Sequence, residues 1–322
     1  MGGRPVLTGP ARVLATINPV GKDGSARHTG GVLSLVLPKG SLEMATLDLF
    51  SAADLAVRRG SDRDYHAVID DPRIDRVRFL RPQEIPQYVE QGLFDLGICG
   101  RDWVQETSSD VVTVTELEYS KATSNPVRIV LAVPKELGVD RGDELPDGVR
   151  VSTEYPELTR RYFEKVGVRA RIVPSYGATE AKVPDIVDAI VDVTETGSSL
   201  RKHGLKVIET LLTSRTELVA NVAAFADEEK RAAMQDLALL LQGAIRARGQ
   251  VLLKLNVAGD DLAGVLEVLP SMTSPTVTEL AKSDHRAVET VVAKRGVNTL
   301  LPRLKAAGAT DILELPISKI VE

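Results

Sequence analysis

Cysteine is almost absent from this chain, and its scarcity limits the kinds of site that the protein can build. Cys99 is the only cysteine among 322 residues, which excludes a disulfide framework and a cysteine-rich metal site. The four histidines include no closely spaced pair, which argues against a zinc site as well. A chain that needs no disulfides is expected in the reducing cytoplasm.

Long apolar runs and a strong excess of either charge are missing too. No stretch approaches the roughly 18 to 20 apolar residues that a membrane-spanning helix requires, so no membrane partner is expected. Lysine and arginine number 40 against 45 aspartates and glutamates, and the formal net charge of -5 argues against a general nucleic-acid binder. At 322 residues the chain exceeds what one core usually supports, which predicts two or three domains.

The first 30 residues lack the pattern of a folded segment. They are rich in glycine and proline, and no acidic residue occurs before Asp23. Such an acid-poor segment with arginines resembles a transit peptide, but it has neither an apolar signal core nor a clear amphipathic period. We therefore expect a disordered extension at residues 1–30.

Apolar runs alternate with helical periodicity from residue 32 onwards. A buried strand at 32–37 leads into a turn at 38–40 and a helix from Ser41, its expected N-cap, to about Arg59. More strands are predicted at 77–80, 93–99, 111–117 and 127–133, and a helix at 85–91. This alternation predicts an α/β fold with mostly parallel sheets.

The chain builds one α/β lobe, then a second, and afterwards returns to the first. The pattern places residues 31–120 and 206–225 in the first lobe and residues 121–205 in the second. Open sheets bind ligands at the carboxyl ends of their strands, so a ligand cleft between the lobes is expected.

The last hundred residues follow a different order. A helix is predicted at 227–249, with acids in its first turn and Gly249 at its end. The elements after it are expected in the order strand, helix, strand, strand, helix, strand. This βαββαβ order predicts a ferredoxin-like domain, and we assign residues 226–322 to it.

The segment DAIVDVTETGSSL at residues 188–200 carries the clearest chemical signal. At about 3.3 Å per residue, Asp188 and Asp192 lie roughly 13 Å apart on a strand, too far to hold one metal ion or one ribose diol together. Asp192 lies beside the turn that follows, whose N–H groups, hydroxyls and glycine suit a phosphate. We interpret the segment as a site for a phosphorylated sugar. An ordinary strand-to-helix turn with a solvated aspartate is the alternative. The turn comprises Thr194, Glu195, Thr196, Gly197, Ser198 and Ser199.

Eight segments, in order from about residue 32 to the C-terminus, match one enzyme family. They are LVLPKGSL, FDLGICGRDW, PVRIVLAVP, VSTEYPELTRRYFEKVGV, GATEAKVPDIVDAIVDVTETGSSLRKHGL, VLLKLNV, VLPSMTSPTV and LPRLKAAGATDILELPISKIV. In these segments the chain resembles ATP phosphoribosyltransferase in its long form, the first enzyme of histidine biosynthesis.

The resemblance implies transfer of the phosphoribosyl group from phosphoribosyl pyrophosphate to N1 of the ATP adenine, with release of pyrophosphate. It implies assistance by Mg²⁺ held mainly by the substrate pyrophosphate, with no dedicated protein site. It also implies two catalytic lobes similar to periplasmic binding proteins and a third, ACT-like domain that binds histidine as an inhibitor. The family forms a hexamer in equilibrium with dimers. The alternative from another class is a two-lobed binding protein or sensor that catalyses nothing.

The resemblance also implies roles for individual residues on the donor side. The loop at 194–199 would hold the 5-phosphate, and Asp192 would accept hydrogen bonds from the ribose hydroxyls. Glu180 is expected to face the cleft as a second acid, with a solvated loop glutamate as the alternative, and Asp188 completes this set.

For ATP, the resemblance points to Lys39, Gly40 and Ser41 in the PKGS turn and to the GRD motif. Many relatives carry arginine where this chain has Ser41, so Arg63 and Lys121 are candidates to supply that charge; a surface salt bridge is the alternative for each. In the GRD motif, Gly100 and Asp102 are the expected contacts, although Asp102 is equally suited to cap a helix.

The tail has its own expected ligand site. By resemblance, the inhibitor histidine would contact Asn256, Ser274 and Thr276. Without the resemblance, the PSMTSPTV segment is a turn bounded by prolines.

Overall fold

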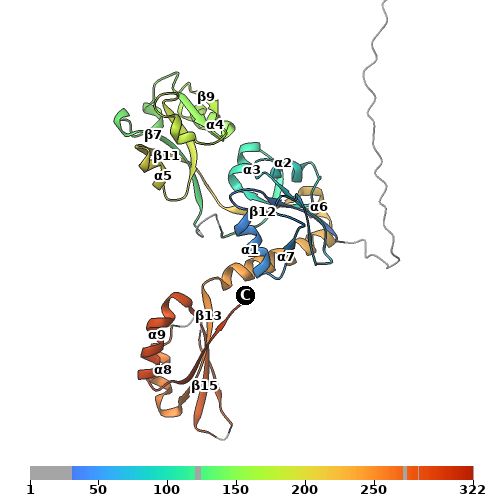
Figure 1. The fold of residues 1–322 in the computed structure, drawn as a ribbon, viewed down its shortest axis with the longest axis vertical. Coiled ribbons are helices and arrows are strands. Elements are labelled where there is room, and N and C mark those ends of the chain that lie inside the picture. The colour runs from blue at the N-terminus through green and yellow to red at the C-terminus, as the bar shows by residue number, and fades with distance from the viewer. Residues whose placement is uncertain (1–30, 120–124, 271–273, 282, 322) are drawn as a thin grey trace, which may run out of the picture. The chain divides into compact units, whose positions relative to one another are not determined.

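The computed structural model describes residues 31–119, 125–270, 274–281 and 283–321, which form three sheets with their helices (Figure 1). The expected extension at 1–30 and the candidate Lys121 lie outside these residues. The predicted organisation, two α/β lobes followed by a βαββαβ domain, is confirmed.

The first sheet has seven strands in the order β2-β3-β4-β1-β5-β12-β6. β1 runs parallel to β4 and β5, whereas β12 runs antiparallel to both β5 and β6. The sheet is therefore mixed and not, as predicted, mostly parallel, because β3 and β12 each run antiparallel to both of their neighbours. The strands are β1 (Leu33–Pro38), β2 (Val57–Arg58), β3 (His66–Ile69), β4 (Ile74–Leu80), β5 (Leu96–Gly100), β6 (Val111–Leu117) and β12 (Thr216–Asn221).

Helix α1 is shorter than predicted. It spans Glu43–Ala52 and ends before Asp54, whose φ of 61° is incompatible with a continuing helix. The N-cap position is Leu42, and no side-chain cap bond forms there, so the prediction of Ser41 as the N-cap is wrong. The other helices of this lobe are α2 (Ile85–Glu90), α3 (Arg101–Thr107), α6 (Val222–Ala226) and α7 (Glu228–Ala247).

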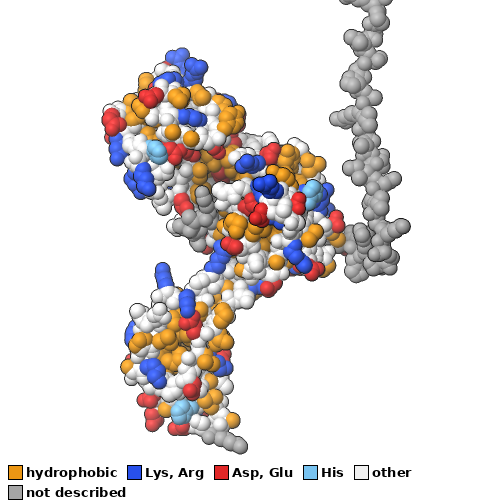
Figure 2. Space-filling view, viewed as in Figure 1, with side chains coloured by type: hydrophobic (Ala, Val, Ile, Leu, Met, Phe, Trp, Pro, Cys, Tyr) orange, Lys and Arg blue, Asp and Glu red, His pale blue; other side chains and the backbone are white. Residues whose placement is uncertain are grey.

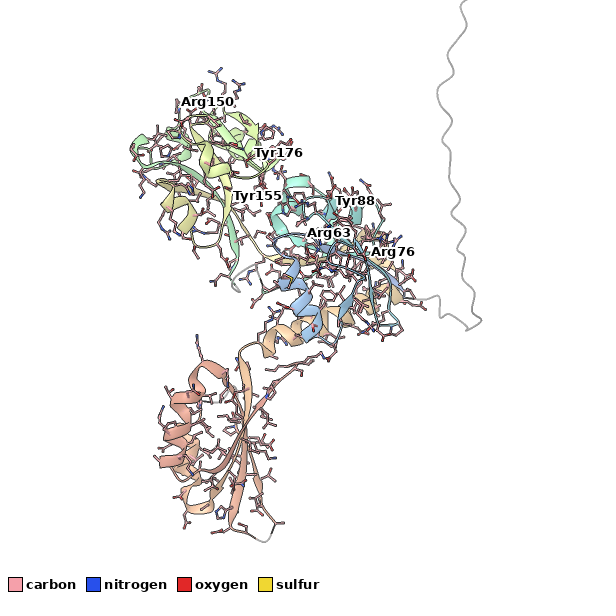
Figure 3. All side chains as sticks on the ribbon, in the orientation of Figure 1. Arg63, Arg76, Tyr88, Arg150, Tyr155 and Tyr176 are labelled. Carbon is pink, nitrogen blue, oxygen red and sulfur yellow. The ribbon has the colours of Figure 1, made fainter. Side chains whose placement is uncertain are left out.

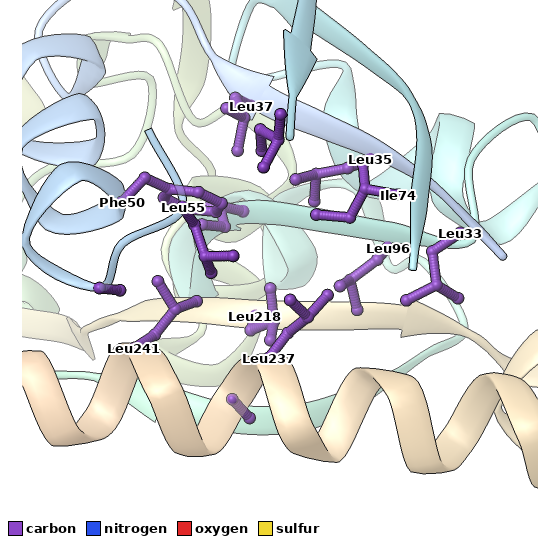
Figure 4. Packing of buried hydrophobic residues seen from close by; sticks show 14 of the residues in the cluster. Leu33, Leu35, Leu37, Phe50, Leu55, Ile74, Leu96, Leu218, Leu237 and Leu241 are labelled. Carbon is purple, nitrogen blue, oxygen red and sulfur yellow. The ribbon is translucent and has the colours of Figure 1, made fainter. Parts of the chain in front are cut away.

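Helix α7 closes the core of the first lobe. Its apolar stripe, which includes Leu237 and Leu241, packs in one cluster with sheet residues such as Leu35, Leu96 and Leu218 (Figure 4). The expected start of the third domain at residue 226 therefore differs from the structure, in which that domain follows α7.

The second sheet has five strands in the order β11-β7-β10-β8-β9. β11 pairs with β7, so residues 206–214 belong to the second lobe and not, as expected, to the first. The chain returns to the first lobe at Arg215. The elements are β7 (Val127–Pro134), β8 (Arg150–Thr153), α4 (Pro156–Val166), β9 (Arg171–Pro174), η3 (Thr179–Lys182), β10 (Ala189–Thr194), α5 (Ser198–Lys202) and β11 (Leu205–Ser214), with short 3₁₀ turns η1 (Lys135–Leu137) and η2 (Gly142–Glu144).

The third sheet has the strand order β14-β15-β13-β16, which is the ferredoxin-like order, and a core of its own. Because side chains alternate along a strand, β13 buries one set beneath the helices and presents the other on the open face. The elements are β13 (Gln250–Ala258), η4 (Gly259–Asp261), α8 (Leu262–Val268), β14 (Thr276–Glu279), β15 (His285–Ala293), α9 (Lys294–Ala306) and β16 (Thr310–Pro316).

Candidate active site

A cavity of about 240 Å³ is lined by residues of both lobes. The first lobe contributes the turn after β1 and the start of α3. The second contributes Glu154 and Tyr155, which follow β8. Arg215, where the chain returns to the first lobe, also lines the cavity. The expected cleft is therefore present, at the carboxyl ends of β1 and β8.

The PKGS turn lines this cavity, and its Lys39 already forms an ion pair with Glu43. Lys39 Nζ donates to Glu43 Oε1 at 3.0 Å, and the N–H of Gly40 donates to Glu43 Oε2 at 3.3 Å. Arg59 contacts the same carboxylate at 2.6 Å. Burial raises the pKa of Glu43, but the hydrogen bonds from Arg59 and Lys39 outweigh it and leave the pKa lowered. The ionised carboxylate therefore stands beside the turn that was expected to bind a phosphate.

Arg81 brings a positive charge to this cavity, close to the PKGS turn, and sequence reasoning missed it. Its Nη1 lies 3.8 Å from the point where a Cβ on Gly40 would stand, and it lines the cavity together with Ser41 and Arg215. The signal was available: Arg81 directly follows β4, and the ends of the parallel strands β1 and β4 meet at one edge.

Arg63 is not among the residues that line the cavity. It is exposed in the loop between β2 and β3 (Figure 3). Arg59, from the same segment, is the residue that reaches inward, to Glu43. The structure therefore does not bring Arg63 together with the other candidate ATP contacts.

Gly100 and Asp102 both line the cavity, but they serve different purposes. Gly100 occupies the N-cap position of α3, so the alternative that Asp102 is the N-cap is wrong. A Cβ on Gly100 would lie 2.0 Å from Asp102 Oδ1, so the close approach requires glycine. The Asp102 carboxylate accepts hydrogen bonds from Ser214 Oγ at 2.6 Å and Tyr155 Oη at 2.8 Å.

The loop at 194–199 is a tight turn that runs from the last residue of β10 into the first turn of the short helix α5. Gly197 takes a φ of 71°, and its N–H donates to Thr194 Oγ1 at 2.8 Å. Thr196 Oγ1 and Ser198 Oγ lie 3.1 Å apart, and Glu195 completes the loop. The turn is thus held by its own hydroxyls and by a glycine in the left-handed region.

Arg201 and Glu180 flank this loop. Arg201 Nη1 donates to the carbonyl of Thr196 at 3.0 Å, which places a cation beside the turn that sequence reasoning had not considered. Ser199 Oγ donates to Glu180 Oε1 at 2.8 Å. Glu180, from η3, is therefore brought to the loop, and its pKa is lowered by its own N–H and by the Ser199 hydroxyl.

Asp192 is a partly buried acid on β10 close to two other acids. Burial raises its pKa to about 6, and the charges of Glu180 and Glu154 add to the effect. The N–H of Val193 donates to Asp192 Oδ1 at 2.7 Å. Glu154 lines the same cavity as the PKGS turn and also lies near Asp192. The cavity and the loop at 194–199 are therefore neighbours.

Asp188 does not join these residues. It lies at the opposite end of β10, where its carboxylate forms an ion pair with Arg150 at 2.7 Å and accepts the N–H of Arg150 at 2.8 Å. These contacts join the start of β10 to β8. The expectation that Asp188 belongs to the site therefore differs from the structure, because the strand separates the two aspartates.

The tail residues gather at the sheet of the third domain. Asn256, on β13, pairs with Ala287, and Thr276, on β14, pairs with Glu289 of the same strand β15. Because Ala287 and Glu289 are two residues apart, Asn256 and Thr276 lie on one face of the sheet. Ser274 precedes β14 and is exposed.

Charged side chains of both signs are interspersed over the face drawn in Figure 2. Among the helices of the described part of the chain, none is long and apolar enough to span a bilayer. In the same residues, no group of three or more His, Cys, Asp or Glu side chains is arranged to hold a metal ion.

Comparison with known proteins decides the family. The family described as ATP phosphoribosyltransferase matches residues 81–243, and the one described as HisG, C-terminal domain, matches residues 247–319. The chain is 47% identical over 291 residues to ATP phosphoribosyltransferase of Pelotomaculum thermopropionicum, which covers 90% of this chain and 99% of that protein. The chain belongs to the ATP phosphoribosyltransferase family.

Other relatives agree with this placement. ATP phosphoribosyltransferase of Desulforudis audaxviator is 47% identical over 289 residues, covering 90% of this chain and 99% of that protein. A solved structure of the ATP phosphoribosyl transferase (HisG:HisZ) complex from Thermotoga maritima matches with 30% identity and a TM-score of 0.56, covering 66% of this chain and 97% of that one. The second family match begins at the last residue of α7, in agreement with the domain boundary in the structure.

Proposed function

We propose that the cavity and the loop at 194–199 carry out the first step of histidine biosynthesis. In this reaction a bond forms between N1 of the ATP adenine and C1 of the ribose. The bond from C1 to the pyrophosphate oxygen breaks, and its electron pair leaves with pyrophosphate. The observation that carries the proposal is the juxtaposition of a cationic cavity at Lys39 and Arg81 with the acid-flanked loop at Asp192.

The loop and its acids hold the donor. The 5-phosphate lies in the turn at 194–199, and Arg201 adds a positive charge to it. Asp192 accepts hydrogen bonds from the ribose hydroxyls, and Glu180 is held in place by Ser199. Carboxylates near C1 stabilise the positive charge that develops on the ribose as the leaving group departs.

The PKGS turn and Arg81 hold the phosphates of ATP. A phosphate that reaches Lys39 and Gly40 takes the place of the Glu43 carboxylate, since both anions require the same donors. Glu43 remains neutralised because Arg59 contacts it at 2.6 Å. The exchange therefore leaves no buried carboxylate without a partner.

The acids beside the loop fit a role for Mg²⁺. Glu180 and Glu154 lie close enough to Asp192 for their charges to raise its pKa, and carboxylate oxygens are the ligands that Mg²⁺ prefers. When bound with the donor, Mg²⁺ would supply neutralisation of the charge on the leaving pyrophosphate. These carboxylates would hold the water shell of that ion.

Regulation and assembly form part of the same proposal. We place inhibitory histidine at the sheet face that carries Asn256 and Thr276, near Ser274. Leu313 and Leu315 of β16 are 55% and 39% exposed, and an apolar strand edge of this kind supports assembly of the chain into dimers and hexamers. The single cysteine, Cys99, is free and buried, which supports a cytoplasmic location.

A pyrophosphate-release assay tests the activity. Purified protein with ATP, phosphoribosyl pyrophosphate and Mg²⁺ is expected to release pyrophosphate only when both substrates are present. Release should stop when EDTA removes the metal and decline when histidine is added. Folded protein that releases no pyrophosphate would contradict the proposal and favour a two-lobed binding protein.

A further inference from the structure

The carboxylate of Asp102 is a buried contact between the two lobes. Asp102 belongs to α3 of the first lobe and is 5% exposed. Its two partners come from elsewhere: Ser214 is the last residue of β11, and Tyr155 precedes α4 in the second lobe. The N–H of Asp102 also donates to Ser214 Oγ, at 3.0 Å. One side chain of the first lobe thus binds two residues of the second lobe, and one of them is the last residue before the chain returns to the first lobe.

Neighbouring contacts reinforce this junction. The rings of Trp103 and Tyr155 stack with their centroids 4.5 Å apart. The carboxylate of Glu106 accepts the N–H groups of Glu157 and Leu158, each at 2.9 Å. Because these are unpaired donors in the first turn of α4, Glu106 of the first lobe caps a helix of the second. Helices α3 and α4 are therefore locked together by hydrogen bonds that neither lobe supplies alone.

The junction lies in the wall of the cavity. Asp102, Tyr155 and Ser214 all line it, and Glu154 is the residue next to Tyr155. The negative charge of Glu154 raises the pKa of Asp192. Because Tyr155 is the next residue in the chain, a shift of Tyr155 would also move Glu154 relative to Asp192. Burial raises the pKa of Asp102, while the hydrogen bonds from Ser214 and Tyr155 lower it. These two hydroxyls therefore stabilise the ionised form of the buried carboxylate. With its side chain almost fully buried and its carboxylate bonded to two protein hydroxyls, Asp102 is poorly placed to bind ATP directly.

We propose that Asp102 is a positioning residue, which orients the second lobe against the first through Tyr155 and Ser214 without contacting ATP. Such a residue brings the loop at 194–199 into line with the ATP phosphates, and a misplacement of about 1 Å between reacting groups reduces the rate on the order of 100-fold. The inference rests on the proposed function, since it assigns the two substrates to opposite sides of the junction.

The test removes single hydroxyls and measures binding and catalysis separately. In the full-length chain, Tyr155→Phe and Ser214→Ala are each expected to lower kcat on the order of tenfold or more. The dissociation constant of ATP alone, measured by calorimetry, should stay within about threefold of wild type in both. Asp102→Asn should lower kcat further, and adding Tyr155→Phe to it should cause little additional loss, because both changes break the same bond.

Tyr162→Phe is the matched control. Tyr162 lies on α4, and its buried hydroxyl has no hydrogen-bond partner among the described residues, so its removal should leave kcat unchanged. If Tyr155→Phe retains kcat like this control, the inference is wrong. It is also wrong if the affinity for ATP falls in proportion to kcat in Ser214→Ala and Asp102→Asn, since that pattern identifies a ligand contact. An inactive wild-type protein would contradict the proposed function instead.

Discussion

At the scale of single residues, the environment of Asp192 sets the pH at which its carboxylate is ionised. The acid lies on a buried strand, and burial raises its pKa to about 6. An ordinary surface aspartate would be fully ionised at that pH. The carboxylate that we propose accepts the ribose hydroxyls therefore titrates close to physiological pH, because the fold removes it from water before a substrate arrives.

The first prediction concerns pH. As the pH falls through about 6, Asp192 gains a proton and its carboxyl loses acceptor capacity, so the KM for phosphoribosyl pyrophosphate should rise while the KM for ATP changes less. Initial rates between pH 5 and 8 measure both constants. Asp188→Asn is the control, since Asp188 pairs with Arg150 at the other end of the strand, and this variant should keep the wild-type profile. A KM for the donor that is flat across this range would contradict the role of Asp192.

The second prediction concerns stability. Because the pKa of Asp192 is higher in the folded protein than in the unfolded chain, ionisation at neutral pH costs folding free energy. This cost declines as the pH falls below about 6 and is lost below the pKa of the unfolded chain, about 3.8. Asp192→Asn should therefore raise the free energy of unfolding at pH 8 by about 1 to 3 kcal/mol while it weakens donor binding. Chemical denaturation at pH 8 and pH 5 checks the sign. A variant less stable than wild type at pH 8 would show that the ionised carboxylate stabilises the fold.

At the scale of elements, local pattern identified strands and helices better than it assigned them to lobes. The apolar runs that predict β6 and β7 match the structure closely, because a buried strand requires apolar side chains at consecutive positions of the sequence. The assignment of β11 failed because strand pairing is not local: this strand is joined to β7 by hydrogen bonds across more than 70 residues of chain. Nothing in either sequence segment specifies that pairing.

The same distinction explains the site. The loop at 194–199 could be predicted because its glycine and hydroxyls are consecutive. Arg81 could have been predicted from its place at a strand end. The junction of Asp102 with Tyr155 and Ser214 could not, because it depends on how two lobes meet, and the three residues are separated by 53 and 59 positions.

The third prediction concerns the loop. Gly197 takes a φ of 71°, and an added Cβ would stand 3.0 Å from Arg201 Nη1. Gly197→Ala should therefore strain the turn, at a cost of about 1 to 2 kcal/mol, and push Arg201 away from it. The KM for phosphoribosyl pyrophosphate should rise on the order of tenfold, and that for ATP much less. Steady-state kinetics with each substrate varied in turn measures both, and equal changes in the two constants would contradict the assignment of the loop. Gly204→Ala is a control for strain, since Gly204 also has positive φ but nothing lies within 4 Å of an added Cβ.

At the scale of the whole molecule, the third domain is separable from the first lobe only after α7. That helix buries Met234, Leu237 and Leu241 against the first sheet. Each of these large side chains contributes about 1.5 to 3 kcal/mol through burial, so the lobe depends on the helix. The family boundary at residue 247 and the core of the sheet agree on this point.

The fourth prediction follows from that boundary. Deletion of residues 248–322 should leave a folded protein that retains some catalysis and loses inhibition by histidine. Deletion of residues 226–322 removes α7 as well, and should yield protein that unfolds at a much lower temperature or aggregates. Thermal unfolding and pyrophosphate release, with and without histidine, compare the two. A shorter deletion that keeps its histidine sensitivity would place the inhibitor site outside the third domain.

The central claim is that the donor and ATP lie on opposite sides of one junction between the lobes. The most direct measurement is a crystal structure of the protein with phosphoribosyl pyrophosphate and ATP bound. We expect the 5-phosphate in the turn at 194–199, the ribose hydroxyls at Asp192 and the ATP phosphates at Lys39 and Arg81. A donor phosphate bound elsewhere, with the turn empty, would contradict this account.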